Sequence, residues 1–323
     1  MTLPREGIVN VAAILTVVAG LLLLWTLAVI PMNIREALTE AERAGAAITP
    51  ATAPERRDAG ALSLVVQNAG QIGLTYAQDR PRLPSPAQVI REFYNSTLDE
   101  EMNGRRGIVR SGSLSNAGLV LHTLKTIETT LYGFVLGAVL GIALAVGIVY
   151  SRAMDLSVMP WAIISQTIPI VALAPMIVLL LSSAGITGLV PRAIIAAYLS
   201  FFPVLVGMVK GLRAPDHMQL DLMRTYNASA AQGFWKLRLP MAVPYLFASL
   251  KVAIAGALVG AIVSELSTSS TQGLGARMLQ GSYYGQTVQI WAALLAAAIL
   301  AAAMVGVVGV ADRLVRRAMG GAA

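Results

Sequence analysis

Three ionisable side chains stand within or beside long apolar runs of the sequence: Glu128, Lys251 and Glu265. A charge is costly in the hydrocarbon core of a bilayer, so such residues are candidates for handling a solute or an ion. Lys251 lies near the end of its run, where the ammonium is expected to reach the lipid headgroups. Glu265 would line an outer opening or contact a partner, although a solvated helix end is an equal alternative. Glu128 would lie at the membrane interface.

Polar residues and prolines interrupt one of the apolar runs. They are Ser165, Gln166, Thr167, Pro169 and Pro175. Proline within a membrane helix frees backbone carbonyl groups, which then need a partner in the protein or in a wet cavity. The pattern predicts a helix that lines a solute path, and the alternative is helix packing through the hydroxyl groups.

An aromatic pair, Tyr283 and Tyr284, precedes the last apolar run. The two rings could stack on a planar solute at an outer mouth, but tyrosines are also common at membrane interfaces.

Glycines recur every fourth residue at Gly133, Gly137 and Gly141, which predicts a helix face that another helix approaches closely. That face would pack within the bundle or form the seam of a homodimer.

Several kinds of chemistry are excluded or disfavoured by composition and by motif. The chain has no cysteine, and its two histidines, His122 and His217, are too few for an ordinary metal site. No phosphate-binding G-x-x-x-x-G-K-[ST] motif occurs, so the chain is not expected to hold ATP in a P-loop. Nucleophile elbows and paired carboxylate motifs are also missing from the sequence. We therefore expect neither an enzyme nor a bound metal or cofactor.

The apolar runs are long enough to cross a membrane. The chain is 56% hydrophobic and 13% charged, with a mean hydropathy of +0.68, and a bilayer core needs roughly 20 apolar helical residues. We predict an all-α integral membrane protein with about six transmembrane helices. Their expected positions are residues 8–30, 127–150, 161–181, 190–209, 245–266 and 288–310. The first run is too long for the core of a signal peptide, so we expect it to be retained as a membrane span and not cleaved off.

Charge in the short loops predicts the orientation of these spans. The basic residues that fall on one side are Arg152, Lys210, Arg213, Arg224, Lys236, Arg238, Arg313, Arg316 and Arg317. That side should be cytoplasmic and should hold both termini, so the net charge of +7 indicates topology rather than nucleic-acid binding. The expected organisation is a first span at 1–30, an extracytoplasmic segment at 31–118 and a five-span core at 119–323.

The largest cytoplasmic feature in this topology is the loop at 210–243. Asn227 tolerates the left-handed backbone of a tight turn, and Ser229 with Gln232 forms a capping-box pattern that would open a second short helix. Pro240 would end that helix. Phe234 and Leu237 share one face and predict an apolar knob that fits a groove on a partner. The alternative is an amphipathic helix lying on anionic lipid, with Trp235 at headgroup depth.

This loop resembles the signature loop of the permease subunits of binding-protein-dependent ATP-binding cassette (ABC) importers. The family pattern is E-A-A, three residues, G, nine residues, I, any residue, L-P, and Asp221, Asn227, Leu237, Leu239 and Pro240 stand in register with it. Asp for Glu retains the charge, and Asn for Gly retains the turn. The resemblance implies a coupling helix that contacts an ATPase subunit. Its residues would be Asp221, Asn227, Ala228, Ser229, Gln232, Phe234, Trp235, Leu237, Leu239 and Pro240.

The resemblance covers most of the chain from Leu83 onward. LPSPAQV at 83–89, TIPIVALAP at 167–175, GLG at 273–275 and the glycine-rich run at 130–152 are similar to the nitrate, sulfonate and taurine type of permease. Within that type, the chain is similar to permeases associated with thiamine-precursor pyrimidines or riboflavin. The segment before Leu83 is longer than is usual for the family, and no role is assigned to it.

The resemblance implies the type I ABC importer permease fold in a bacterial inner membrane. Its expected partners are ATPase subunits that hold ATP and magnesium, an extracytoplasmic solute-binding protein and a second permease copy in a homodimer. The cargo would be a small polar or heteroaromatic solute. The alternative function is a secondary transporter driven by an ion gradient, which should show two repeat halves and carboxylates near the middle of the membrane.

Overall fold

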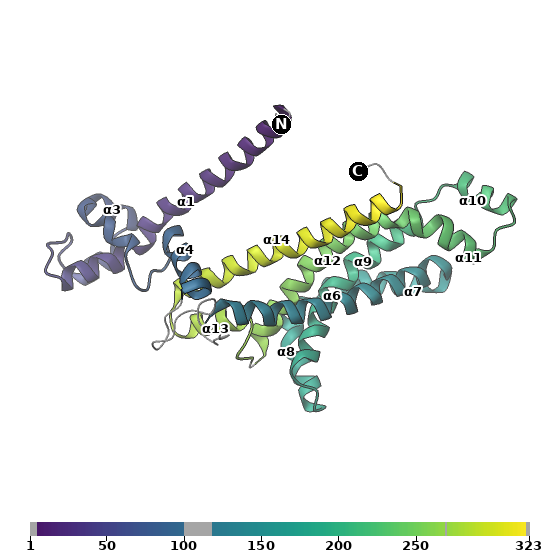
Figure 1. Ribbon diagram of the computed structural model, residues 1–323. Coiled ribbons are helices and arrows are strands. Elements are labelled where there is room, and N and C mark those ends of the chain that lie inside the picture. Colours follow the sequence, from purple (N-terminus) through teal and green to yellow (C-terminus); the bar gives the residue numbers. More distant parts are fainter. Residues whose placement is uncertain (1–4, 100–117, 269, 321–323) are drawn as a thin grey trace. The chain divides into compact units, whose positions relative to one another are not determined.

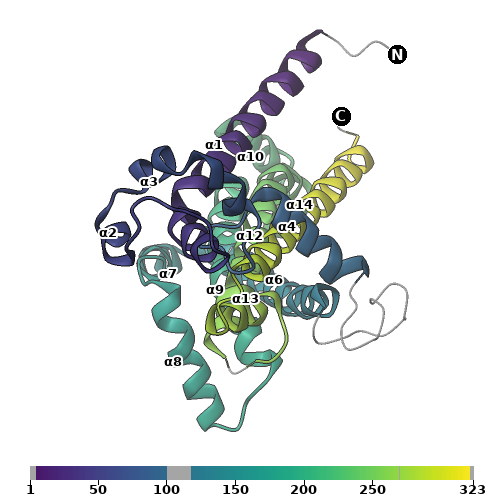
Figure 2. The ribbon, with the colours of Figure 1, turned by 90° about the vertical axis from the view of Figure 1, so that its left-hand side faces the viewer.

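The computed structural model describes residues 5–99, 118–268 and 270–320. All regular structure in these ranges is helical (Figure 1). The chain forms two compact units, of which unit 1 comprises Met1–Ser113 with Met278–Leu295, and unit 2 comprises Leu114–Arg277 with Ala296–Ala323. Figure 2 shows the same helices after a quarter turn. The expectation of an all-α protein is confirmed.

Five helices or continuous helical segments are long and apolar enough to cross a membrane. They are α1 (Arg5–Arg43), α6 (Leu119–Tyr150), α9 (Leu189–Leu212), the segment Ala230–Ser267, which contains α12 (Leu239–Ser267), and α14 (Thr287–Ala318). A sixth candidate is the pair α7 (Arg152–Ser165) and α8 (Ile170–Ser183), which meet at 102°. The prediction of about six spans agrees with this count.

The bend between α7 and α8 corrects the expectation of one continuous span at 161–181. Pro169 precedes the first residue of α8 and has no backbone N–H with which to continue the helical ladder. The carbonyl group of Ser165 at the end of α7 instead accepts a hydrogen bond from the hydroxyl of Tyr198 on α9. A carbonyl that leaves the helix thus finds its partner on a neighbouring helix.

Unit 1 is organised around the second half of α1, which continues past Ile30 with Pro31 inside it. Against it lie α2 (Ala53–Asp58), α3 (Ala61–Gln67), the 3₁₀ helix η1 (Ala69–Tyr76) and α4 (Pro86–Tyr94). The π-helical turn η2 (Asn95–Asp99) follows α4 and contacts it. Its core includes Ile34, Leu38 and Leu64. The buried Asn33 donates to the Thr75 and Leu83 carbonyls at 3.1 and 2.8 Å, which fastens the following segments to α1.

Unit 2 is built on three helices that approach one another through small residues. A Cβ atom added at Gly137 of α6 would lie 1.9 Å from Ser200 Oγ and 2.8 Å from the Ala197 carbonyl oxygen on α9. Gly260 of α12 lies against the backbone of Ala196 on the same helix α9. The glycine face of α6 therefore packs within the bundle, as the first alternative predicted, and the homodimer seam is not its role.

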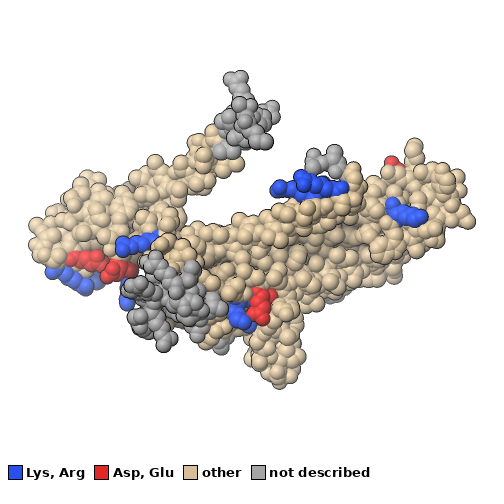
Figure 3. All heavy atoms as spheres, viewed as in Figure 1, with Lys and Arg blue, Asp and Glu red and all other residues tan. Residues whose placement is uncertain are grey.

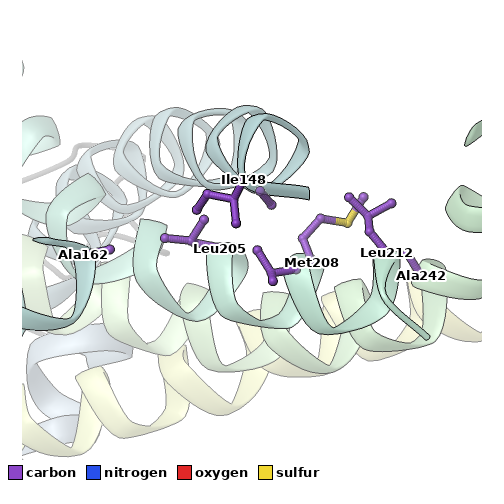
Figure 4. Packing of buried hydrophobic residues seen from close by; sticks show 8 residues of the cluster. Ile148, Ala162, Leu205, Met208, Leu212 and Ala242 are labelled. Carbon is purple, nitrogen blue, oxygen red and sulfur yellow. The ribbon is translucent and has the colours of Figure 1, made fainter. Parts of the chain in front are cut away.

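Larger apolar side chains fill the end of the bundle beyond these glycines. Figure 4 shows Leu205 of α9 next to Ile148 of α6 and Leu212 of α9 next to Ala242 of α12, with Met208 between them; all five belong to one buried cluster. Small residues thus set the helix spacing, and branched or long side chains close the core where the helices separate.

Charged side chains are sparse along the flanks of the long helices of unit 2 in the face shown in Figure 3. The carboxylate of Asp312 binds two cationic side chains within the unit. Lys251 Nζ lies 2.7 Å from Asp312 Oδ2, and Arg316 Nε donates to Asp312 Oδ1 at 2.5 Å. Lys251 therefore does not simply extend to the headgroups as expected. The buried carboxylate of Asp312 on α14 holds its ammonium instead.

Glu265 lies at the centre of a buried hydrogen-bonded network. Its carboxylate is completely buried and accepts from Thr126 Oγ1 of α6 at 2.9 Å and from the Gly275 N–H at 2.9 Å. Thr126 Oγ1 in turn accepts from the Leu274 N–H at 2.9 Å, at the start of α13 (Leu274–Tyr283). The alternative of a solvated helix end is therefore wrong for Glu265, because three elements exclude water from its carboxylate.

Gly137→Leu should separate α6 from α9, because the contact leaves no room for a Cβ atom. We expect a loss of about 1–3 kcal/mol in the free energy of unfolding, measured as a lower melting temperature in detergent. Gly306→Leu on α14 is the matched control, since nothing lies within 4 Å of its Cβ position. Equal melting temperatures for the two variants would contradict this account of the bundle.

Glu265→Leu should leave the Gly275 N–H and the Thr126 hydroxyl without their acceptor, at a cost of about 1–3 kcal/mol for each unpaired group. The expected result is a lower melting temperature and faster proteolysis after Ser267. Glu128→Leu is the control, because that carboxylate is partly exposed and pairs with Lys125 one helical turn away. Equal melting temperatures for the Glu265→Leu and Glu128→Leu variants would show that the network has no stabilising role.

Candidate functional site

The loop between α9 and α12 folds into a hairpin of two short helices. The first, α10 (His217–Thr225), begins with a capping box in which Asp216 Oδ1 accepts from the Gln219 N–H at 2.7 Å. It is a helix separate from α9, which ends at Leu212. The second begins with the predicted capping box, in which the Ser229 N–H donates to Gln232 Oε1 at 2.9 Å, and comprises α11 (Ala230–Gly233).

The turn between these helices has the predicted geometry. Asn227 has a φ angle of 50°, in the left-handed region, and its N–H donates to the Arg224 carbonyl at 2.9 Å. The Ala228 N–H donates to the Met223 carbonyl at 2.9 Å, so the two bonds complete a Schellman motif. Asparagine tolerates this conformation better than most residues, which is why it can replace the glycine of the family pattern.

The hairpin is anchored to the bundle by aromatic and cationic contacts. The Phe234 ring meets the Tyr150 ring of α6 edge to face, with 6.1 Å between centroids. Arg238 lies over the same Tyr150 ring at 5.8 Å and donates to the carbonyl of Leu212, the last residue of α9, at 2.8 Å. A displacement of the hairpin would therefore act directly on the ends of α6 and α9.

The structure covers part of the predicted knob within the chain. Phe234 packs against the buried cluster of unit 2, and both Phe234 and Leu237 are partly buried. Pro240 does not end the helix, because a π-helical turn at η3 (Phe234–Arg238) leads into α12 and places the proline in its first turn. The missing proline N–H is tolerated at that position.

The exposed apolar face lies mainly on α10. Met218, Leu222 and Tyr226 follow one another at four-residue spacing with exposed fractions of 81%, 55% and 78%, and Trp235 is 64% exposed. This spacing places the first three side chains on one side of the helix. Only Trp235 was among the predicted residues. The four-residue spacing in the sequence was the signal that could have identified the other three.

The remaining predicted coupling residues support the hairpin or border it. Asp221 forms an exposed pair with Arg224 at 3.1 Å. Ala228 lies in the turn, and Ser229 and Gln232 are occupied by the capping box. Leu239 packs against the buried cluster at the start of α12. These residues shape the hairpin, while the α10 face and Trp235 provide its apolar surface.

The predicted path residues occupy separate places. Ser165 ends α7, Gln166 and Thr167 lie in the bend, and Pro169 precedes α8, with Thr167 and Pro169 exposed. Glu265 is in the buried network of unit 2 and faces no opening within that unit. Tyr283 and Tyr284 belong to unit 1 and are 78% and 70% exposed. No path through the membrane follows from these positions.

The two histidines differ in their surroundings. His122 is buried in unit 2 and its Nδ1 accepts from the Gly273 N–H at 2.9 Å, whereas His217 is exposed at the start of α10. Among the described residues, no group of three or more histidine, cysteine, aspartate or glutamate side chains is arranged to hold a metal ion.

Comparison with known proteins identifies the family of the chain. Residues 137–321 match the family described as binding-protein-dependent transport system inner membrane component. A probable ABC transporter permease protein of Haemophilus influenzae is 33% identical over 54% of this chain and 69% of its own length.

Two further relatives have names that include a solute. The formylaminopyrimidine transport permease protein ThiX of Halalkalibacterium halodurans is 28% identical over 60% of this chain and 68% of its own length. The riboflavin transport system permease protein RibX of Chloroflexus aurantiacus is 28% identical over 73% of this chain and 80% of its own length. The family match covers more than half of the chain, and the chain has the long apolar helices of a membrane protein. The protein therefore belongs to the inner-membrane permease components of binding-protein-dependent ABC import systems.

Proposed function

We propose that the α10 hairpin couples this permease to an ATPase subunit, which holds the ATP and magnesium of the importer. The observation that carries the proposal is the exposed face of Met218, Leu222 and Tyr226 on a helix whose far side is tied to the bundle through Phe234 and Arg238. Exposed aromatic and methionine side chains are enriched at protein interfaces. This chain itself binds no cofactor in the proposal.

The anchors give the hairpin a way to transmit movement. ATP can change the conformation of the permease only if the ATPase contacts the hairpin differently in its open and closed states. Phe234 and Arg238 both contact Tyr150 at the end of α6. A shift of the hairpin would therefore displace the end of α6 relative to α9, with each helix moving as a rigid body. This coupling would open the solute path alternately to the two sides of the membrane.

The proposed topology places the hairpin and both termini in the cytoplasm and residues 31–118 outside. A solute-binding protein would deliver the cargo there, and a second copy of the chain would complete the path. The polar bend at Ser165–Pro169 would line that path, with Tyr283 and Tyr284 near its outer mouth. The names of ThiX and RibX support a heteroaromatic solute as the cargo, whereas sulfonates and nitrate remain the other candidate class.

Leu222→Ser combined with Tyr226→Ser should remove the ATPase from the permease. Both side chains are exposed and make no core contacts, so the bundle should fold normally while an interface centred on them weakens by about tenfold or more. The measurement is the amount of P-loop ATPase that co-purifies with the tagged chain from its native membrane in mild detergent.

The matched control is Leu62→Ser combined with Val66→Ser, which changes two apolar residues of α3 in unit 1 that are at least as exposed as those on α10. We expect this variant to retain the ATPase at the wild-type level. Co-purification that is undiminished by the α10 substitutions would refute the proposed docking face. If the wild type itself brings down no ATPase under conditions that preserve other membrane complexes, the proposed coupling through α10 is refuted as well.

A further inference from the structure

The helix α4 of unit 1 has an apolar side that no function assigned above uses. Ile90, Tyr94 and Leu98 follow one another at four-residue spacing along α4 and η2, with exposed fractions of 61%, 50% and 44%. On the other sides of the helix, Val89 is buried and Arg91 lines a polar cleft of unit 1. Since side chains four residues apart lie on one side of a helix, α4 is amphipathic and its apolar side is exposed.

The start of α4 is fixed against α1 by hydrogen bonds. Trp25 Nε1 donates to the Pro84 carbonyl at 3.0 Å, and Asn33 Nδ2 donates to the Leu83 carbonyl at 2.8 Å. The Leu83 N–H donates back to Asn33 Oδ1 at 3.0 Å. The chain then enters α4 through the capping box of Ser85. The helix α4 therefore begins beside the part of α1 that lies between Trp25 and Asn33.

This part of α1 is where the helix leaves the lipid. Residues 12–24 are all exposed and almost all apolar, Leu27 is exposed as well, and the segment is long enough to span a membrane. Farther along α1, Asn33 and Ile34 are completely buried within unit 1. The edge of the hydrocarbon core therefore falls between Leu27 and Asn33, and Trp25 just before it is a residue type that is enriched at membrane interfaces.

The direction of α4 is that of a helix lying in the membrane surface. Figure 2 shows α4 running across the direction of α1. Because α1 crosses the bilayer, a helix that runs crosswise to it at the level of its exit lies along the interface. Helices in this position bury their apolar side roughly 5–10 Å into the boundary between headgroups and acyl chains.

We propose that α4 and η2 bind the lipid surface of the outer leaflet, with Ile90, Tyr94 and Leu98 inserted among the headgroups and upper acyl chains. The choice of leaflet rests on the proposed topology, which places residues 31–118 outside, whereas the contact with lipid does not depend on it. The inserted helix gives unit 1 a second membrane contact beside α1 and holds the unit at a fixed depth.

The side chains of α4 favour insertion over attraction between charges. Arg91 and Glu92 are the only charged residues between positions 86 and 98, and their charges offset each other. The helix therefore has no net charge with which to attract anionic headgroups. The apolar side chains supply the affinity, and the Tyr94 hydroxyl can stay among the headgroups while its ring is buried. Insertion should be the same in zwitterionic and anionic membranes.

Spin labels on single cysteines of the full-length chain test this contact, because the chain has no cysteine of its own. Ile90→Cys and Tyr94→Cys carry labels on the apolar side, and Arg91→Cys carries one on the polar side of the same helix. The labelled chains are placed in phosphatidylcholine vesicles, with or without phosphatidylglycerol. Collisions of each label with oxygen, which dissolves in lipid, are compared with collisions with a water-soluble nickel chelate.

We expect the labels at positions 90 and 94 to lie roughly 5–10 Å below the headgroup level in both kinds of vesicle. The label at position 91 should instead collide mainly with the nickel chelate. Leu62→Cys is the matched control: Leu62 is exposed and apolar, but its helix α3 packs against Leu38 of α1, beyond the exit from the lipid. All four positions are exposed, so the substitutions should leave the melting temperature unchanged.

Three results would overturn the proposal. Labels at positions 90 and 94 that meet the nickel chelate as freely as the label at position 62 would place α4 in water. Labels that neither reagent reaches would show that a protein partner covers this side. Immersion in the anionic vesicles alone would show that charge and not insertion binds the helix. None of these results affects ATPase co-purification through α10, so failure of this proposal is distinguishable from failure of the coupling proposal.

Discussion

The close approach of α6, α9 and α12 is the constraint on which unit 2 depends. Lipid supplies no hydrophobic force between helices, so their association relies on tight packing and on hydrogen bonds. Gly133, Gly137 and Gly141 bring α6 against the backbone of α9, and Gly256 and Gly260 do the same for α12. The interhelical hydrogen bonds of Glu265 and the Lys251–Asp312 pair then fasten neighbouring elements to this three-helix stack.

A tightly packed stack also determines how a contact at the hairpin can have an effect elsewhere. Helices that interlock through backbone contacts move as bodies rather than deforming locally. Tyr150 at the end of α6 receives both Phe234 and Arg238, and Arg238 also holds the last carbonyl of α9. The exposed face of α10 and the interior of the bundle are thus connected by a few short contacts, which is a suitable arrangement for a docking element that drives a conformational change.

Local chemistry made part of this structure predictable from the sequence. The apolar runs identified the membrane helices, Asn227 identified the turn, and Ser229 with Gln232 identified the helix start, because each feature depends on residues close together in the chain. The direction of Phe234, the burial of Glu265 and the partner of Lys251 were not predictable in this way. Each is decided by residues far away in the sequence: Tyr150, Thr126 and Asp312, respectively.

The measurement that tests the central claim most directly is a site-specific cross-link in the assembled membrane. The chain has no cysteine, so Leu222→Cys provides a single attachment point for a photoreactive maleimide on α10, and Val66→Cys provides one on α3. The account predicts that the probe at position 222 cross-links to a P-loop ATPase subunit and that the probe at position 66 does not. A probe at position 222 that reacts only with reagents from outside the cell, or that never reaches an ATPase, would contradict it.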